Sequence, residues 1–537
     1  MCGIICVVSR PSARPLPLAA DILDALDRAI AAGATGNIAE SGRLVGEADA
    51  SLRGESGLGT LIDNVALVTG LVSRVDQLDA LAAGAELQLE SESGLSTREV
   101  ERRSNELIAL RDATWSLRND RLRTAKAVGE LAGKDASASA RNAYLSIQQA
   151  FSALDRMEVR GRDSAGVNVL VWGHGLDATD KRVAPLLAGR LDDALFTNGS
   201  VRVGAGNRAW SFVYKAAAEI GELGDNTRAM RTTVANDALL RLLVSQPGAR
   251  VSILGHTRWA SVGIISEPNA HPVNSEEVGG NSAAPFMLAA LNGDVDNHAE
   301  IKVRNGLQIA EPITTDAKVI PTVVARKNAA GMSFVDSFRE TVAEFEGSVA
   351  IAVASADEPN SMMLALRGSG QGLYVGIAED RFIVASEPYG VVEETLHYVR
   401  MDGESLADAN NPSSRGQVIA LDGDNAGTLA GMRMLAYDGT TIPLDESNVH
   451  VAEVTTRDID RGEHKHFLSK EIAESPLSFR KTLRGKISER NGQLEATLDT
   501  TVLPDDIRAK LTAGTFTRIR VIGQGTAAIA GRSLAQL

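Results

Sequence analysis

Short blocks of apolar residues recur along most of the chain, and this pattern predicts strands. Residues 2–8 form such a block. It is typical of a buried strand, although a run this short does not by itself exclude a helix. Similar blocks predict strands over residues 164–172, 251–260, 286–294, 346–355, 362–368, 372–380 and 381–386. Because few crossover helices separate these strands, we expect stacked antiparallel sheets covered by helices.

Other segments repeat their apolar residues with the period of a helix. Between the predicted strands, this period predicts helices over residues 232–244, 313–327 and 333–347. Residues 173–205 are rich in Gly, Asp and Ala and have no clear period. We interpret residues 173–205 as a variable insertion.

Residues 12–150 are predicted to be a largely helical insertion. Residues 65–90 and 139–159 have helical periodicity, and Ser96 and Glu99 fit a capping box that opens a further helix. Val100, Leu107, Leu110 and Leu117 of that helix are separated by seven, three and seven positions. This spacing is typical of the apolar a and d positions along which two helices pack. We expect an antiparallel helical hairpin that projects from a domain; a packed helical subdomain without a partner is the alternative.

Composition narrows the function classes. A length of 537 residues suggests two or more domains, and 44% apolar with 23% charged residues is ordinary for globular protein. The net charge of -14 argues against a nucleic-acid partner or an anionic membrane. No apolar run approaches the ~20 residues of a membrane span. Two cysteines form no disulfide framework, so we expect a reducing, cytoplasmic location.

The two cysteines have different expected roles. On a strand, Cys2 and Cys6 lie roughly 13 Å apart, too far for a disulfide. Cys6 is interpreted as a small buried hydrophobic residue. If Met1 is removed, Cys2 carries a thiol and an α-amine with a pKa of about 7.7–8.0, so one residue supplies nucleophile and base. The alternative is that Cys2 is only a small residue near the chain start.

Five motifs follow one another along the chain. They are MCGIIC (1–6), LDRMEVRGRDSAGV (154–167), GHTRWASVGIISEPNAHPV (255–273), LNGDVDNH (291–298) and TTDAKVI (314–320). Each is weak alone, but in this order they resemble the type 2 glutamine amidotransferases, most closely the glutaminase domain of the glucosamine-6-phosphate synthases. The resemblance covers about the first 450 residues, with the two insertions.

This resemblance implies a fold and a nucleophile. The fold is α+β, a four-layer αββα N-terminal nucleophile hydrolase sandwich over residues 2–455. The family also implies that Met1 is removed and that Cys2 attacks the side-chain amide of glutamine. No metal or cofactor is expected, since the eight histidines show no spaced ligand set.

Amide hydrolysis through a thioester also needs an oxyanion hole. Asn292 offers a side-chain amide and Gly293 a backbone N–H at the predicted end of a strand. Losing one such donor costs roughly 2.7–4 kcal/mol of transition-state stabilisation. A plain Asn-Gly turn is the alternative interpretation.

The substrate needs groups that hold its amino-acid end. Arg258 can bind the α-carboxylate as a bidentate fork, and Asp316 can accept from the α-ammonium. A surface ion pair and a helix cap are the alternatives. Trp259 matches a family residue on a loop that closes over glutamine, or it is a core aromatic. Arg160 and Gly161 match family residues near the nucleophile, and we interpret them as supports.

The remaining motif positions include two histidines and several departures from the family. We expect His256 and His271 to be structural, because this mechanism needs no imidazole. The family's Thr-His pair is replaced by Ser261 and Val262, and Ser261 keeps a hydroxyl for a substrate contact. Arg162 replaces a tyrosine, and Asp294 with Val295 replaces an apolar pair.

The carboxyl-terminal part resembles the segment after the glutaminase domain in the same synthases. Residues 456–510 are predicted to be a linker, and 511–537 the first strand and helix of a truncated sugar isomerase domain. Gly523, Gly525 and Thr526 could present N–H groups to a phosphate, or form an ordinary strand-to-helix turn. We therefore expect the chain to be part of a longer protein.

The leading hypothesis is a glutamine amidotransferase. Ammonia from glutamine would pass to a sugar phosphate, by resemblance fructose 6-phosphate, giving glucosamine 6-phosphate, and we expect a homo-oligomer. One alternative is an amidotransferase for a different acceptor. Another is a glutamine-sensing or scaffold protein that acts through the helical insertion.

Overall fold

The computed structural model describes residues 2–92, 95–217, 222–280, 284–484, 486–496, 500 and 503–536. These residues fall into two compact units. The first consists of Met1–Asp79 and Leu110–Asp460, and the second of Ala80–Ala109 and Arg461–Leu537. The predicted removal of Met1 concerns a residue outside the described ones.

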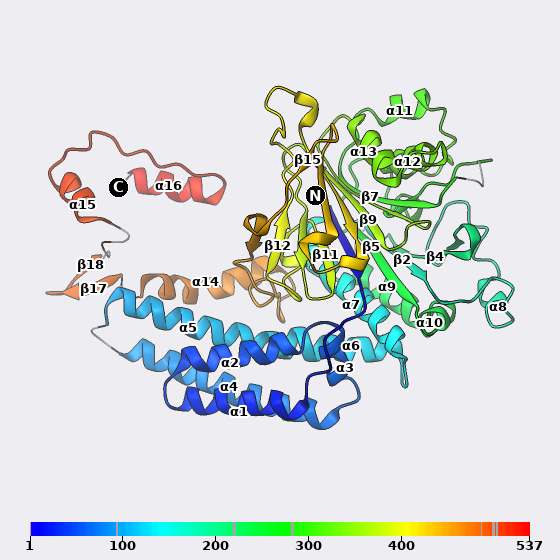
Figure 1. Cartoon of the computed structure of the whole chain (residues 1–537). Helices are drawn as coiled ribbons and strands as arrows, with labels where there is room; N and C mark the ends of the chain where they lie inside the picture. Colours follow the sequence, from blue (N-terminus) through cyan, green and yellow to red (C-terminus); the bar gives the residue numbers. More distant parts are fainter. Residues whose placement is uncertain are drawn as a thin grey trace. The chain divides into compact units, whose positions relative to one another are not determined.

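The first unit contains a nine-stranded sheet in which every recorded pairing is antiparallel (Figure 1). The first strand of the chain lies at its centre and is buried along its whole length. The strand order is β16 (Val449–Val451), β12 (His397–Arg400), β10 (Tyr374–Ile377), β11 (Arg381–Ala385), β1 (Gly3–Ser9), β5 (Arg250–Arg258), β2 (Ser164–Trp172), β4 (Ala209–Ala216) and β3 (Val201–Val203).

A second antiparallel sheet of seven strands completes the β-structure of this unit. The strands of this sheet follow one another in the order β15 (Thr441–Ile442), β14 (Met432–Ala436), β13 (Gln417–Asp422), β9 (Ser361–Arg367), β8 (Val349–Ser355), β7 (Met287–Gly293) and β6 (Val273–Asn274). The eight strands predicted before residue 387 are all present. The strands missed by the sequence analysis are mostly short or lie at sheet edges, where a period of two is hard to detect.

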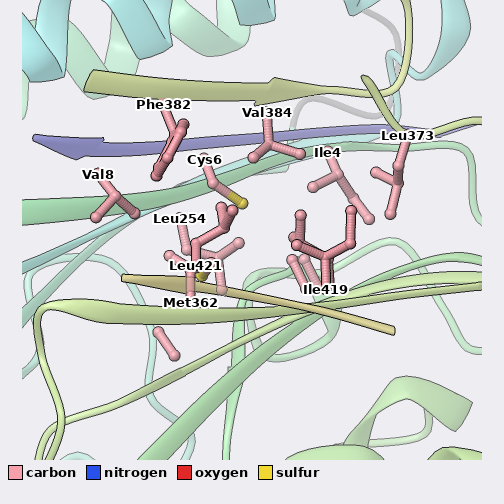
Figure 2. Close-up of a cluster of buried hydrophobic side chains, with 14 of the residues drawn as sticks. Ile4, Cys6, Val8, Leu254, Met362, Leu373, Phe382, Val384, Ile419 and Leu421 are labelled. Atoms are coloured by element: carbon pink, nitrogen blue, oxygen red, sulfur yellow. The ribbon is translucent and has the colours of Figure 1, made fainter. Parts of the chain in front are cut away.

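The two sheets pack face to face around an apolar core. Ile4, Cys6 and Val8 alternate along β1, so their side chains point to the same side of the sheet (Figure 2). Met362 of β9 and Ile419 of β13 face them from the other sheet (Figure 2). The prediction that Cys6 is a small buried hydrophobic residue is confirmed, since its exposure is 0%.

Helices cover both outer faces and complete four layers. α7 (Ala138–Met157) packs on β1 and β5, and α9 (Asp225–Asn236) on β2 and β4. On the other side, α12 (Val319–Ala329) packs on β7, and α13 (Phe334–Ala343) on β9, around a second apolar core. The predicted αββα sandwich is confirmed.

The single helix predicted over residues 232–244 is wrong. The chain breaks at Asp237, between α9 and α10 (Ala238–Val244). The Asp237 carboxylate accepts the backbone N–H groups of Leu239 and Leu240, both at 3.0 Å, and so caps α10. It also accepts the hydroxyl of Tyr214 at 2.8 Å and pairs with Arg190. These partners fix the break, which the apolar period alone does not show.

The helical insertion is larger than the predicted hairpin. Before α7 it comprises α1 (Ala19–Ala34), α2 (Ile38–Ser51), α3 (Gly54–Leu61), α4 (Val65–Ser91), α5 (Thr97–Trp115), a π-helical turn (Ser116–Leu122) and α6 (Arg123–Ala132). The predicted seam residues Val100, Leu107, Leu110 and Leu117 are buried. Among the described helices none alone could span a membrane; α3 and α4, bent by 102°, meet the length and composition requirement only as a pair.

The second unit holds the carboxyl-terminal elements α14 (Phe467–Leu483), β17 (Ile487–Arg490), β18 (Gln493–Ala496), α15 (Asp505–Thr512) and α16 (Thr526–Gln536). Within this unit, Lys481 pairs with Glu86 and Arg484 with Glu90, both at 2.8 Å. The strand predicted before α16 does not form. Ile519 is 75% exposed and Ile522 92%, and no strand among the described residues pairs with this segment to complete ladder hydrogen bonds. The smaller α8 (Ala184–Leu187) and α11 (His298–Arg304) belong to the first unit.

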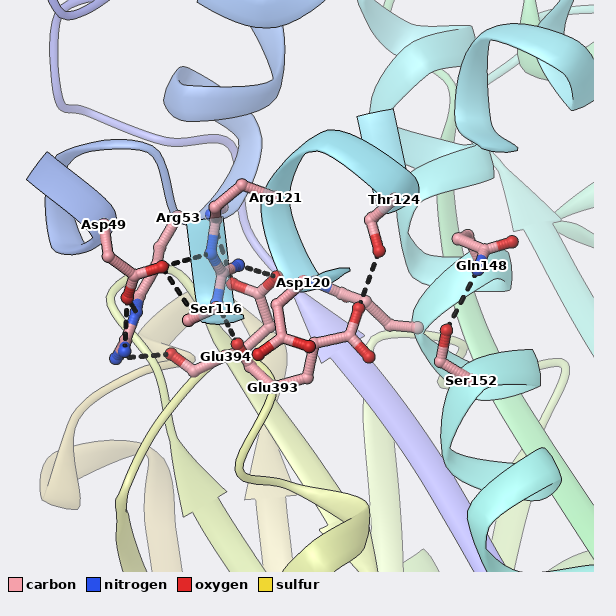
Figure 3. Close-up of polar contacts among 12 residues, drawn as sticks. Asp49, Arg53, Ser116, Asp120, Arg121, Thr124, Gln148, Ser152, Glu393 and Glu394 are labelled. Atoms are coloured by element: carbon pink, nitrogen blue, oxygen red, sulfur yellow. Dashed lines mark hydrogen bonds and ion pairs between the residues drawn. The ribbon is translucent and has the colours of Figure 1, made fainter. Parts of the chain in front are cut away.

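A buried polar cluster joins the insertion to the sandwich (Figure 3). Arg121, on the π-helical turn, donates to Asp49 of α2 at 3.0 Å and to Glu394 of the sandwich at 3.1 Å. Thr124 donates to Glu393 at 2.8 Å. Removing one partner of such a pair leaves an uncompensated buried charge, which costs about 3–5 kcal/mol. The cluster therefore fixes where the insertion docks.

The same cluster contains more carboxylates than guanidinium groups. Asp49, Asp120, Glu393 and Glu394 face Arg53, Arg121 and Arg156, which leaves one negative charge in excess. Burial and the neighbouring charge of Glu393 raise the pKa of Asp120 to about 6. Asp120 also accepts the hydroxyl of Thr456 at 2.6 Å. We therefore expect Asp120 to be the group that takes up a proton.

We predict that Asp120→Asn is stabilising above pH 6. The folded pKa of Asp120, about 6, exceeds the ordinary value near 3.9. The parent therefore loses stability as the pH rises through 4 to 6, whereas the amide has no charge to bury. At pH 8, Asp120→Asn should raise the free energy of unfolding by about 1–2 kcal/mol, with a smaller gain at pH 5. Denaturant titrations at both pH values measure this.

The control is Asp135→Asn, which removes an exposed carboxylate in the α6–α7 loop and should change stability little at either pH. A loss of more than 1 kcal/mol for Asp120→Asn at pH 8 would mean that the Asp120 charge stabilises the arginines.

Candidate active site

The pairing of β1 with β5 sets the position of Cys2. Gly3 lies opposite Thr257 in the antiparallel register, so the start of β1 meets the end of β5. There the backbone N–H of Trp259 donates to the Cys2 sulfur at 3.2 Å, and the thiol lies 3.5 Å from the Trp259 carbonyl. The residue after the strand therefore holds the candidate nucleophile.

Opposing effects act on the Cys2 thiol. Burial raises its pKa, and the charge of Asp294 adds to this. The Trp259 N–H, the amino terminus and the positive charge of Arg258 each lower the pKa. The net direction is upward, so the thiol needs a base before it can attack.

Asn292 is the second-to-last residue of β7 in the opposite sheet and is completely buried. Its Nδ2 donates to the Ser386 hydroxyl at 2.7 Å, and its Oδ1 lies 3.2 Å from Nε2 of His256. The Ser386 oxygen also accepts the backbone N–H of Ile4 at 2.8 Å. One hydroxyl therefore links β1 to the side chain of Asn292. The recorded Nδ2 contact, with Ser386, uses one of its two hydrogens.

Gly293 can be no other residue. Its φ is 86°, in the left-handed region that favours glycine. A Cβ at this position would lie 1.9 Å from the carbonyl oxygen of Ser348. The sharp turn after Asn292 therefore depends on this glycine.

The two motif histidines are buried and neutral. Their ring centroids lie 4.5 Å apart, with the ring planes tilted by 34°. Burial and the charge of Arg258 lower the pKa of His256 to about 3, and burial lowers that of His271 well below its usual range. Because Asn292 Oδ1 only accepts, Nε2 of His256 is the donor between them. His271 lies 3.0 Å from the Thr315 hydroxyl. Both are structural, and His256 orients the Asn292 amide.

Arg258 ends β5 and is 2% exposed. Its guanidinium donates to the carbonyls of Ile264 at 3.2 Å, Gly263 at 3.4 Å and Val262. Burial lowers its pKa. Arg258, predicted to bind the substrate carboxylate, is therefore at the site, but its guanidinium donates to the backbone of the loop that follows β5.

Asp316 lies at the same place, at the start of the turn that leads into α12. Its carboxylate accepts the backbone N–H of Val295 at 2.8 Å. Burial raises its pKa, and the charge of Asp294 adds to this. The structure thus brings Asp316 to the turn after Gly293.

Arg160 and Gly161 support the backbone beside Cys2. A Cβ on Gly161 would lie 2.6 Å from the carbonyl carbon of Arg258, so only glycine allows this approach. Arg160 pairs with Glu387 and donates to the carbonyl of Ser386 at 3.4 Å. Both contacts fit the predicted supporting roles.

Residues 259–264 form an exposed loop over the site. Trp259 is 57% exposed, so it is not a core aromatic. The backbone N–H of Ala260 donates to the Asp163 carboxylate at 2.8 Å. The Ser261 hydroxyl donates to Asp294 at 2.5 Å. Two of the groups that hold this loop, Arg258 and Asp294, lie within electrostatic reach of the Cys2 thiol.

The predicted phosphate residues lie in the second unit. Gly523, Gly525 and Thr526 stand at the start of α16, where a Cβ on Gly523 would lie 2.9 Å from Ala527 and Ala528. This packing fits a tight turn into a helix. Among the described residues, no group of three or more His, Cys, Asp or Glu side chains could hold a metal ion.

Three residues make contacts at the site that the sequence did not predict. Ser386 follows β11 and has no motif around it, so only the sheet pairing finds it. Asp163 was noted in its motif without a role, and it accepts from the loop. Asp294 was noted only as a departure, and it bonds Ser261.

We predict that Ser386→Ala destabilises the protein by about 2–4 kcal/mol, because the substitution leaves two buried donors, the Ile4 N–H and the Asn292 amide, without their acceptor. Denaturant titration measures this loss. Ser369→Ala, at an exposed serine, is the control and should change stability by less than about 0.5 kcal/mol. A loss no larger than that of the control would show that the link between the sheets is dispensable.

Comparisons with known proteins agree with the motifs. No family model matches the chain. It is 29% identical over 294 residues to the glutamine–fructose-6-phosphate aminotransferase (isomerizing) of Bacillus cereus, covering 55% of this chain and 42% of that protein. The enzyme of the same name from Caulobacter vibrioides is 25% identical over 319 residues, 59% of this chain and 46% of that protein. The chain thus spans less than half the length of these curated relatives.

Among solved structures, the glutamine phosphoribosylpyrophosphate amidotransferase of B. subtilis matches with 17% identity and a TM-score of 0.33, over 54% of this chain and 47% of that one. The sequence relatives confirm the resemblance that the five motifs indicated. Over the matched residues, the chain is similar in sequence to glutamine–fructose-6-phosphate aminotransferases.

Proposed function

We propose that this chain hydrolyses the side-chain amide of glutamine and supplies the ammonia to a sugar phosphate. The observation that carries the proposal is the arrangement at the end of β1. The Cys2 thiol lies just before β1, within electrostatic reach of Arg258 at the end of β5. The charge of Asp294, which follows the Asn292–Gly293 end of β7, also reaches this thiol. The names of the curated relatives support glutamine as the donor and fructose 6-phosphate as the acceptor.

The first step uses Cys2 as nucleophile. After removal of Met1, the free α-amine of Cys2 takes the thiol proton, and the sulfur forms a bond to the amide carbon of glutamine. The carbonyl oxygen then carries the negative charge of the tetrahedral intermediate. The second Nδ2 hydrogen of Asn292 and the backbone N–H of Gly293 are the donors that stabilise it.

The intermediate then collapses. The carbon–nitrogen bond breaks, the α-amine returns its proton to the leaving nitrogen, and ammonia departs from a thioester on Cys2. Water, deprotonated by the same amine, attacks the thioester and releases glutamate. His256 takes no proton in these steps because its low pKa keeps it neutral. It holds the amide of Asn292 in the orientation that donates.

We expect the chain without Met1 to release glutamate from glutamine, and Cys2→Ala to lower the rate by at least about 10³-fold, as loss of a nucleophile does in other hydrolases. The assay follows glutamate enzymatically. Cys6→Ala is the matched control, since this second cysteine is a buried core residue, and a folded Cys6→Ala variant should keep the activity. Equal background release by the parent and by Cys2→Ala, both folded, would reject the proposal.

The acceptor and the assembly are separate parts of the proposal. An amino sugar phosphate formed from glutamine and fructose 6-phosphate, and absent with Cys2→Ala, would support the acceptor. Glutamate release without any amination of fructose 6-phosphate would favour a different acceptor. The homo-oligomer and the cytoplasmic location stay predictions from the sequence. Light scattering of the purified chain tests the former.

A further inference from the structure

The chain's own oxygens occupy the donors expected to bind the substrate carboxylate. The Ser261 hydroxyl, predicted to contact substrate, donates to Oδ1 of Asp294 at 2.5 Å. The Arg258 guanidinium, predicted to hold the α-carboxylate, donates to backbone carbonyls of residues 262–264. A substrate carboxylate can use these groups only after such contacts exchange.

Of these internal partners, Asp294 is the one that carries a charge. It follows Gly293 directly and is half-buried. Its negative charge raises the pKa of both Cys2 and Asp316, so it lies within electrostatic reach of each. Among the described residues, no cation forms an ion pair with Asp294. Its recorded side-chain partner is Ser261, on the loop that carries Trp259.

We propose that Asp294 is an internal competitor of the substrate α-carboxylate, which occupies the Ser261 hydroxyl in the free site and is displaced when glutamine binds. This inference rests on the proposed function. A hydroxyl that donates to one carboxylate cannot donate the same hydrogen to another. Asp294 also repels an incoming carboxylate, because two negative charges at short range raise each other's energy. Asp294 therefore weakens glutamine binding, and in the free site it holds the loop through its hydrogen bond with Ser261.

A second possible role for Asp294 predicts the opposite change in glutamine affinity. If its carboxylate received the α-ammonium of glutamine, as predicted for Asp316, removing its charge would weaken binding. Competition with the α-carboxylate predicts tighter binding. The direction of the change in the dissociation constant therefore decides between the two roles.

Binding is measured by calorimetry with L-glutamine, in a Cys2→Ala chain so that nothing is hydrolysed. Adding Asp294→Asn should lower the dissociation constant about 5–10-fold, because the amide keeps an acceptor for Ser261 and loses the charge. Asp294→Ala, a second variant, should bind at least as tightly as Asp294→Asn. Asp296→Asn removes an exposed charge two residues away and should leave the dissociation constant unchanged. Unchanged or weaker binding by both Asp294 variants would overturn the proposal.

Two further measurements separate this proposal from the proposed function. In a Ser261→Ala background, Asp294→Asn should gain less affinity, because the contested donor is gone; an undiminished gain would overturn the competition. In the active chain, Asp294→Asn should lower KM for glutamine 5–10-fold with little change in kcat. If the parent releases no glutamate but Asp294→Asn still binds glutamine more tightly, the function fails and the competition stands. If glutamate is released and KM does not fall, the competition fails and the function stands.

Discussion

The antiparallel pairing of β1 is the constraint on which the site depends. β1 lies between β5 and β11, and the register Gly3–Thr257 places the start of the chain beside the end of β5. A slip of one residue would turn Ile4, Cys6 and Val8 out of the inter-sheet core. The apolar side chains that stabilise the sandwich therefore also fix Cys2 against the backbone of Trp259.

A single hydroxyl connects this strand to the other sheet. Ser386 accepts from the backbone of Ile4 and from the side chain of Asn292, and His256 holds the far side of the same amide. The buried amide thus has a defined orientation without any contact to Cys2. Preorganised donors of this kind stabilise a developing charge at little reorganisation cost. The same strand pairing therefore packs the core and orients the candidate oxyanion-hole amide.

The insertion and the loop over the site are held by different kinds of contact. Buried charges around Arg121 and Glu393 fix the insertion, and their loss would be expensive because water cannot replace them. The loop from Trp259 to Ile264 is held near solvent, where the Ser261–Asp294 hydrogen bond exchanges more easily. The buried charges keep the insertion in one position, whereas the loop contacts can break to let a substrate enter.

Particular residues show how far the sequence was informative. The apolar blocks before residue 387 predicted eight strands that are all present. The order of five motifs indicated Cys2, Asn292, Arg258 and Asp316 as members of one site. The break at Asp237 and the absent strand around Ile519 were not predictable from period. A capping side chain decided the first, and the lack of a partner strand decided the second.

The sequence alone determined the residue types of the site and the layered fold, because apolar period and motif order are local properties of a chain. Only the tertiary structure decided which groups meet. Ser386 lies 382 positions from Ile4, and Asp294 lies 33 from Ser261. No local pattern encodes such pairs, since sheet pairing and the turn after Gly293 create them. The physical reason is that hydrogen bonds and charges act through space, whereas periodicity reports only neighbours along the chain.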